Sequence, residues 1–329
     1  MPFLERRSNL TKKKKRRRLK KKWRYRFSLL GIILLLWLIL GPIKGHFLHK
    51  QESKEATSVT TVKKKKTSPT RKSVKQTFVK ATNHDINLYQ DADLNSDVLE
   101  LVPPGEIFNY QSVKDDFYLV TSNKGNTGYI SKNEASKFTK KMYQPIHTLK
   151  NAIIVLNPGH GGQDSGASSI DEQYFEKDMT VAMAKVVKKT LEKAGAKVYL
   201  THTSSSKYVY LDDITQFSMD KNADVFLSIH FDAADIDNQY SGIKTYCYYN
   251  KYQNLAESMN HAFDNLPLDN LGIDYGNFEV IRETTQPALL LELGYMNNEK
   301  DLAYITSKDY RQKVADDIVK GLKNYFKNN

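Results

Sequence analysis

The chain has 329 residues, enough for roughly two or three domains. Its single cysteine, Cys247, excludes an intramolecular disulfide and a cysteine-based zinc cluster. The formal net charge of +13 is confined to the N-terminal part: residues 6–26 hold 14 Lys/Arg and no acid, and residues 44–75 carry a net +8. Residues 76–329 carry 26 Lys/Arg against 34 Asp/Glu. Because this larger part is acidic, we predict no nucleic-acid partner.

Residues 27–43 (FSLLGIILLLWLILGPI) form an uncharged apolar run of about the minimum length for a membrane-spanning helix. The basic tail over residues 1–26 is expected to stay in the cytoplasm by the positive-inside bias. A cleaved signal peptide is the alternative, but the long basic region and the lack of a clear cleavage site favour an uncleaved anchor. We therefore predict a single-pass protein of the cell membrane whose remaining domains lie outside, facing the cell wall of a Gram-positive bacterium.

The next two regions differ in composition. Residues 44–75 are rich in Lys, Thr and Ser without apolar periodicity, which predicts a flexible basic linker. Residues 76–141 alternate short apolar stretches with turn formers such as the Pro-Pro-Gly at 103–105. This spacing predicts a small all-β barrel of five or more strands.

Residues 150–329 alternate strand and helix patterns, which predicts one α/β domain with a mainly parallel sheet and helices on both faces. The apolar runs predict strands, and the positions with helical spacing predict helices between them. Strands are expected over residues 151–157, 197–201, 223–230, 241–249 and 287–294, and helices over residues 176–195, 211–222, 254–266 and 308–326.

Four ionisable residues fall where functional groups gather in such folds, beyond the carboxyl ends of the strands. His160 follows the first strand, Glu176 opens the next helix, His230 ends the third strand and Glu292 lies late in the last one. Two imidazoles and a carboxylate form the His₂Glu set of a catalytic zinc site, so we predict one Zn²⁺ ion held by His160, Glu176 and His230. An ionised Glu in an apolar strand costs several kcal/mol unless it is paired or functional. We therefore assign Glu292 the catalytic proton transfer.

The stretches around these residues, LNPGHGGQDSGA, ADVFLSIH and PALLLELG, resemble the N-acetylmuramoyl-L-alanine amidases of the zinc-dependent Amidase_3 type. In that family the positions that match His160, Glu176 and His230 bind zinc, and the one that matches Glu292 is catalytic. The resemblance implies hydrolysis of the peptidoglycan amide between the lactyl group of N-acetylmuramic acid and the first L-Ala of the stem peptide.

Residues 76–141 resemble a bacterial SH3 domain in Ile86-Asn87-Leu88, in PPGE at 103–106 and in GNTGYI at 125–130. Members of that family often bind wall peptides or glycans, so the resemblance implies a wall-binding module. A spacer or packing domain is the alternative.

The sequence departs from the amidase pattern at positions that would contact substrate. His202 stands where an Arg is usual, Asp232 replaces an Asn, and Leu271 replaces an Arg before Gly272. Three alternatives therefore stay open: a catalytically idle wall-binding scaffold, an amidase that needs a membrane-protein activator, and a metallo-deacetylase or peptidase with a similar site. The intact four-residue set favours the amidase.

Overall fold

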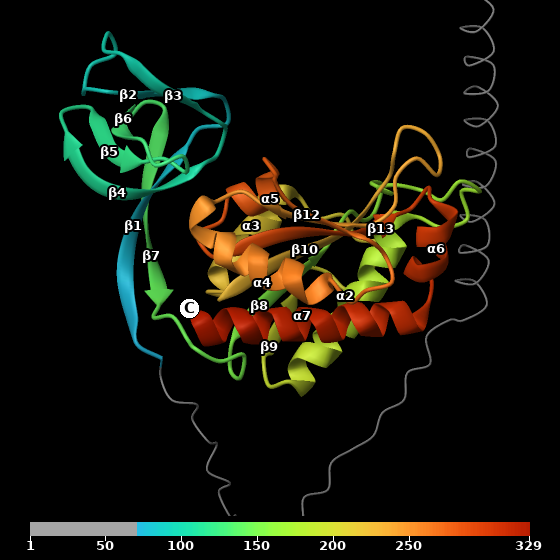
Figure 1. Ribbon diagram of the computed structural model, residues 1–329. Coiled ribbons are helices and arrows are strands. Elements are labelled where there is room, and N and C mark those ends of the chain that lie inside the picture. The colour runs from blue at the N-terminus through green and yellow to red at the C-terminus, as the bar shows by residue number, and fades with distance from the viewer. Residues whose placement is uncertain (1–70) are drawn as a thin grey trace, which may run out of the picture. The chain divides into compact units, whose positions relative to one another are not determined.

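The computed structural model describes residues 71–329, which belong to one compact unit and form two β-sheets (Figure 1). The predicted cytoplasmic tail, the predicted transmembrane helix and most of the predicted linker lie outside the described residues. Within residues 71–329, no helix has the length and apolar character needed to cross a membrane.

The first sheet is antiparallel and curls around a small core that includes Val79, Leu88 and Val120. Its strand order is β3-β2-β6-β5-β4-β1-β7. β1 and β7 pair over nine residues, from Ser73 opposite Tyr143 to Ala81 opposite Ala135. The strands are β1 (Ser73–Ala81), β2 (Ile86–Tyr89), β3 (Val98–Val102), β4 (Ile107–Lys114), β5 (Phe117–Thr121), β6 (Thr127–Ser131) and β7 (Ala135–Tyr143).

The second sheet has the order β12-β11-β13-β10-β8-β9. Neighbouring strands in this sheet run parallel, except that β11 and β13 are antiparallel to each other. The sheet is therefore mixed but mainly parallel, as the alternation of strands and helices in the sequence predicted. Its central strands are apolar on both sides because helices cover both faces. The strands are β8 (Ile153–Pro158), β9 (Lys197–Leu200), β10 (Val225–Asp232), β11 (Ile243–Cys247), β12 (Asn270–Tyr275) and β13 (Ala288–Tyr295).

Helices on the two faces of this sheet bury separate clusters of side chains. The larger cluster packs α2 (Glu176–Lys193), α4 (Gln253–Phe263) and α7 (Lys308–Asn328) against the sheet. The smaller one packs α3 (Leu211–Asp220) and the short α5 (Glu279–Arg282) against the other face, as Figure 1 shows. The 3₁₀ helix η1 (Asn250–Tyr252) precedes α4, and α6 (Glu299–Ile305) follows β13. The predicted helices on both faces are confirmed.

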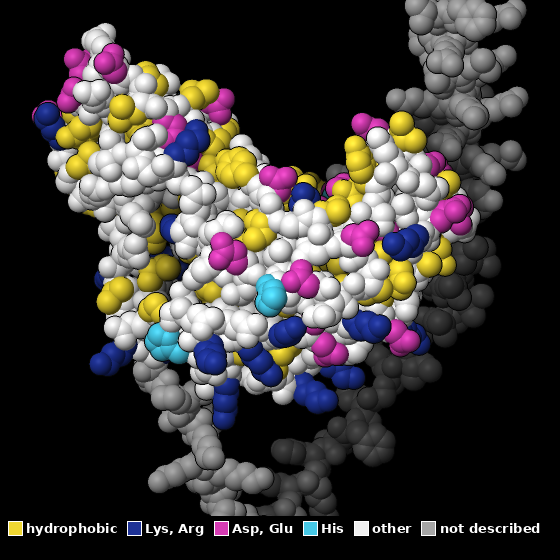
Figure 2. Space-filling view, in the orientation of Figure 1, with side chains coloured by type: hydrophobic (Ala, Val, Ile, Leu, Met, Phe, Trp, Pro, Cys, Tyr) yellow, Lys and Arg dark blue, Asp and Glu magenta, His cyan; other side chains and the backbone are white. Residues whose placement is uncertain are grey.

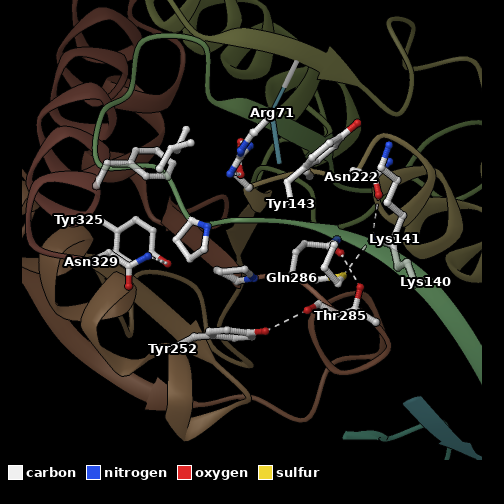
Figure 3. A pocket seen from close by; sticks show the side chains of 17 residues that line it. Arg71, Lys140, Lys141, Tyr143, Asn222, Tyr252, Thr285, Gln286, Tyr325 and Asn329 are labelled. Carbon is white, nitrogen blue, oxygen red and sulfur yellow. Dashed lines mark hydrogen bonds and ion pairs between the residues drawn. The ribbon is translucent and has the colours of Figure 1, made fainter. Parts of the chain in front are cut away.

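The first sheet contacts the α/β domain directly. Phe78 and Ile107 form a small buried cluster with Met219 of α3. Nearby, a cavity of about 160 Å³ lies between β7 and the end of α7, where Arg71 forms an ion pair of 2.6 Å with Asp224 (Figure 3). On the face of the molecule seen in Figure 2, basic side chains gather along the lower edge, where Figure 1 places α7, and acidic ones are interspersed.

Candidate active site

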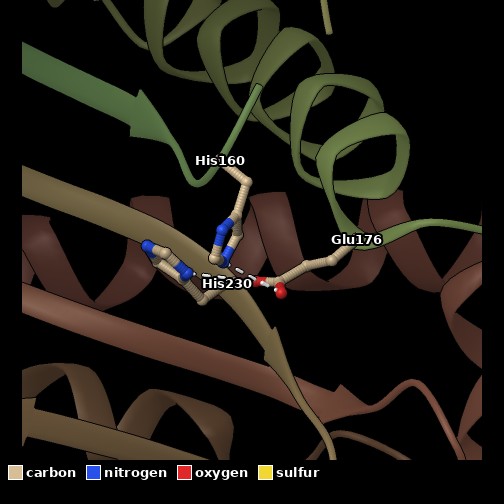
Figure 4. A group of neighbouring side chains, drawn as sticks. All are labelled: His160, Glu176 and His230. Carbon is tan, nitrogen blue, oxygen red and sulfur yellow. Dashed lines mark hydrogen bonds and ion pairs between the residues drawn. The ribbon is translucent and has the colours of Figure 1, made fainter. Parts of the chain in front are cut away.

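Three of the predicted site residues come together at the carboxyl end of the mainly parallel sheet. His160, Glu176 and His230 each offer one ligand atom, and these atoms lie within 4.8 Å of one another. Glu176 Oε2 lies 3.0 Å from His160 Nε2, and its Oε1 lies 3.0 Å from His230 Nδ1. Figure 4 shows both imidazoles directed at the Glu176 carboxylate. Two imidazole nitrogens and one carboxylate at this spacing fit the coordination preference of zinc.

Glu176 is held by the backbone as well as by the two imidazoles. It begins α2, where the helix dipole favours a carboxylate, and it is 3 % exposed. Its oxygens accept hydrogen bonds from the backbone N–H groups of Ala167 and Phe231, at 2.9 and 3.1 Å. Burial alone would raise its pKa, but the hydrogen bonds with His160 and His230 lower the pKa of Glu176 to about 2. The group is therefore an anion at any physiological pH.

His160 is fixed in a conformation that non-glycine residues rarely adopt. Its φ is 63°, a strained value that is often found at functional sites. Its Nδ1 lies 2.8 Å from Asp164 Oδ2, which leaves Nε2 directed at Glu176. A carboxylate on the far nitrogen fixes the tautomer and orientation of a metal-binding histidine. Burial alone would lower its pKa, but the hydrogen bonds with Glu176 and Asp164 raise the pKa of His160 to about 9.

A glycine makes room for this arrangement. Gly166 has φ +63°, and a Cβ atom at this position would lie 2.3 Å from Glu176 Oε2 and 2.6 Å from the His160 ring. Any side chain here would therefore displace the cluster. This close approach explains physically why the loop after β8 is rich in glycine.

His230 is oriented by a chain of polar side chains beneath it. Its Nε2 lies 3.1 Å from Ser228 Oγ, so its Nδ1 is the nitrogen that faces Glu176. Ser228 also accepts a hydrogen bond of 2.9 Å from Asn157, whose amide oxygen accepts one of 2.8 Å from Thr201. Asp164, Ser228 and Asn157 are not among the site residues predicted from the sequence. The only signals available were a carboxylate four residues after His160 and polar residues at two buried strand positions.

Glu292 lies beside His230 because the two residues pair directly in parallel strands β10 and β13. Its Oε2 is shielded from solvent and has no hydrogen-bond partner among residues 71–329. Burial raises its pKa well above the ordinary value, and the charges of Glu176 and Asp232 add to this effect. A carboxyl group with a raised pKa next to the three-residue cluster has the property that acid–base catalysis requires.

A cavity of about 500 Å³ opens beside the two imidazoles, which is within the range of small-molecule sites. His160, Asp164 and His230 line one part of it. Residues 277–280 and Arg282, around α5, line another. Glu292 does not line this cavity, but Leu290, two residues earlier on the same face of β13, does. Two of the three predicted metal ligands, His160 and His230, therefore border a space that a substrate can enter.

A second group of acidic side chains lies around α5 and the start of α3. Asp212, Glu279 and Glu283 also place ligand-type atoms within 4.8 Å of one another. Here Lys80 lies among them, with its Nζ 2.8 Å from Glu283 Oε2 and 4.0 Å from Asp212 Oδ1. A lysine ammonium thus occupies the place that a cation would take.

His202 stands where the amidase pattern usually has an Arg. Its side chain is buried and packs against the loop that carries His160. It is 4 % exposed, and its Nε2 has no hydrogen-bond partner within the described residues. A Cβ atom on Gly161 would lie 3.6 Å from this nitrogen. The side chain therefore supports the loop from below and does not line the cavity.

Both domains of the chain resemble known protein families. The sequence model of the N-acetylmuramoyl-L-alanine amidases matches residues 154–324, and that of the bacterial SH3 domain matches residues 84–136. A probable cell wall amidase LytH of Staphylococcus epidermidis is 44% identical over 180 residues, which cover 54% of this chain and 60% of the relative. A probable cell wall amidase LytH of Staphylococcus aureus is 41% identical over 180 residues, which again cover 54% of this chain and 60% of the relative. The match therefore spans less than two thirds of these relatives.

Solved structures match the α/β domain. The catalytic domain of the amidase CwlV from Bacillus (Paenibacillus) polymyxa var. colistinus is 35% identical, with a TM-score of 0.51, over 53% of this chain and 97% of that domain. An N-acetylmuramoyl-L-alanine amidase from Clostridium difficile 630 is 29% identical, with the same TM-score, over 53% of this chain and 95% of that structure. Since the family match alone covers more than half of the chain, we conclude that this protein belongs to the N-acetylmuramoyl-L-alanine amidase family.

Proposed function

We propose that the protein is a zinc-dependent N-acetylmuramoyl-L-alanine amidase that acts on peptidoglycan. The observation that carries the proposal is the cluster of His160, Glu176 and His230, whose two imidazoles line a cavity, with Glu292 beside His230. The bond that we assign to the reaction is the amide between the lactyl group of N-acetylmuramic acid and L-Ala.

The chemistry follows from what each group can do. His160, Glu176 and His230 would hold a zinc ion, which when bound would bring the pKa of a water close to neutral and polarise a carbonyl group. Glu292 takes a proton from the attacking water and delivers it to the leaving nitrogen of L-Ala. The water oxygen bonds to the lactyl carbonyl carbon and the carbon–nitrogen bond breaks. The products are a lactyl carboxylate on the glycan and a peptide with a free L-Ala amino terminus.

The protonation states support these roles. Glu176 needs no deprotonation to act as a ligand, because its pKa is about 2. Asp164 on His160 and Ser228 on His230 leave one nitrogen of each ring for the metal. A dication held by the cluster would lower the pKa of the adjacent Glu292 carboxyl group, and this would counteract the effect of burial. Glu292 can therefore accept a proton when the metal is bound and release it during the same cycle.

We also propose that residues 27–43 anchor the chain in the cell membrane, with the amidase domain facing the wall and a membrane protein as a possible activator. This proposal rests on the apolar run and on the basic residues that precede it. Extraction of cell membranes with alkaline carbonate should leave the full chain in the pellet. Release into the supernatant would refute the anchor.

The reaction can be tested on purified peptidoglycan. We expect the full chain, purified in mild detergent and supplied with zinc, to release stem peptides whose amino-terminal residue is L-Ala. A matched reaction with added membrane extract would detect a required activator. Absence of such peptides in both reactions would refute the amidase and favour the wall-binding scaffold. New reducing sugar ends or shortened peptides would indicate a different hydrolase.

A further inference from the structure

One wall of the active-site cavity is a short segment, residues 277–283, which contains α5. Residues 277–280 and Arg282 all line the cavity together with the two imidazoles. Arg282 is 7 % exposed, and its Nη1 donates a hydrogen bond of 2.7 Å to the side-chain oxygen of Asn277. Its Nε–H has no acceptor among the described residues. The wall therefore carries a guanidinium group that is held in place by its neighbours, and its positive charge borders the cavity.

The SH3-like domain contacts the end of this segment through an ion pair with Glu283. Lys80 of β1 lies 2.8 Å from Glu283 Oε2, while the other oxygen of the same carboxylate lies 2.8 Å from Arg282 Nη2. The turn before β4 packs closely against the same carboxylate at Gly105. A Cβ atom on Gly105, whose φ is +69°, would lie 2.0 Å from Glu283 Oε1. Glu283 thus links the SH3-like domain to Arg282 by one side chain.

A second connection runs through two tyrosines that follow β11. The backbone N–H of Ile107 donates to the hydroxyl of Tyr249 at 3.0 Å, and this hydroxyl lies 2.7 Å from the carbonyl oxygen of Arg282. Tyr248 donates a hydrogen bond of 2.6 Å to Glu106 Oε2. Glu106 is 1 % exposed and Tyr249 is 4 % exposed. Because buried polar groups are costly when they lose a partner, this network holds the two domains in one arrangement.

We propose that the SH3-like domain is a positioning element of the active site, in addition to any affinity that it has for the wall. Lys80, Gly105 and the start of β4 fix residues 277–283, and through them Arg282, at the edge of the cavity. The consequence for substrate binding rests on the amidase activity proposed above. The mechanical part of the proposal, which is that the SH3-like domain keeps residues 277–283 ordered, does not depend on amidase activity.

Hydrogen exchange tests the mechanical part in the full chain. Lys80→Met keeps the aliphatic stem but removes the ion pair with Glu283. Lys75→Met is the matched control, because Lys75 is an exposed lysine on the same strand that forms no ion pair within the described residues. We expect exchange of the α5 amides of Ile281, Arg282 and Glu283 to speed up by about tenfold in Lys80→Met, with β10 unchanged in both variants. Lys80→Arg should restore the slow exchange.

Kinetics test the consequence for substrate. No metal ligand contacts Lys80, so Lys80→Met should raise KM by about tenfold with kcat within about twofold, and Lys75→Met should change neither. Exchange of the α5 amides that is equal in both variants would overturn the proposal, as would an unchanged KM in an active enzyme. A wild-type chain that releases no product would refute the amidase function instead, and exchange would then decide the positioning role alone.

Discussion

Residues 71–329 contain two compact triads of metal-binding side-chain types, and only one of the two has the chemistry of a metal site. Both triads bring ligand-type atoms within 4.8 Å of one another. In the first, two imidazoles face a carboxylate that is 3 % exposed, and each far nitrogen has its own partner in Asp164 or Ser228. In the second, which consists of Asp212, Glu279 and Glu283, the ammonium group of Lys80 pairs with Glu283 and lies 4.0 Å from Asp212. Proximity alone does not define a metal site, because the neighbours decide which cation is bound.

The largest effect should come from removing a ligand of the first triad. We expect His230→Ala to lose zinc and to lower amidase activity by at least about 10⁴-fold, because the group that activates the attacking water is lost. Zinc per chain by atomic emission and product release by chromatography would check this. Normal zinc content in this variant would show that the metal, if any, lies elsewhere.

Glu292→Gln should separate metal binding from catalysis. The amide keeps the size of the side chain but cannot exchange protons, so we expect a loss of about 10³-fold in kcat with full zinc content. Asp232→Asn is a suitable comparison, because its carboxylate influences the pKa of Glu292 without pairing with His230. If Glu292→Gln retained activity, proton transfer would have to be reassigned.

Asp164→Asn should weaken zinc binding at the first triad without removing a ligand. The carboxylate fixes the His160 ring from its far nitrogen, so we expect zinc affinity to fall by about 10- to 100-fold, while the folded structure persists. Competition with a chromophoric chelator would measure the dissociation constant. An unchanged constant would mean that the His160 ring is already fixed by the loop.

The zinc affinity should depend on pH with a defined sign. The pKa of His160 is raised to about 9 in the metal-free protein, so this ring carries a proton at neutral pH that zinc must displace. Affinity should therefore fall as pH falls, by about tenfold per pH unit between about pH 6 and about pH 8. Glu176, with a pKa of about 2, adds no proton in this range. A flat profile would indicate that His160 is not a ligand.

The smallest effect should come from the second triad. Asp212→Asn removes an exposed carboxylate that lies 4.0 Å from Lys80, so zinc content and affinity should stay within about twofold of the wild type. Loss of a bound zinc from this variant would show that the lysine does not exclude a metal there.

Much of the fold follows from local pattern, and the rest depends on distant contacts. The long strands and helices of the α/β domain lie close to the predicted ranges, because each has an apolar face or run. β12 escaped prediction because Asn270–Tyr275 contains Gly272 and has no buried face. The four-residue α5 is too short for any periodic signal. The contacts of Lys80 and Glu106 with the α/β domain join residues more than a hundred positions apart, so no local pattern reveals them.

The active site likewise has residues that local sequence pattern reveals and residues that depend on the three-dimensional arrangement. Strand-end position and residue type were enough to bring His160, Glu176, His230 and Glu292 together as candidates, and the structure places them side by side. Their assigned roles stay predictions. The residues that orient them could not be singled out, because Asp164 and Ser228 act only through the geometry of a loop and a strand.

The most direct test of the central claim is hydrolysis of peptidoglycan in water labelled with heavy oxygen, followed by mass spectrometry of the products. The proposed reaction predicts one labelled oxygen in the lactyl carboxylate of muramic acid and none in the released peptide, with no label incorporated by Glu292→Gln. Label in a peptide carboxylate or at a sugar reducing end, or equal labelling by Glu292→Gln, would contradict it.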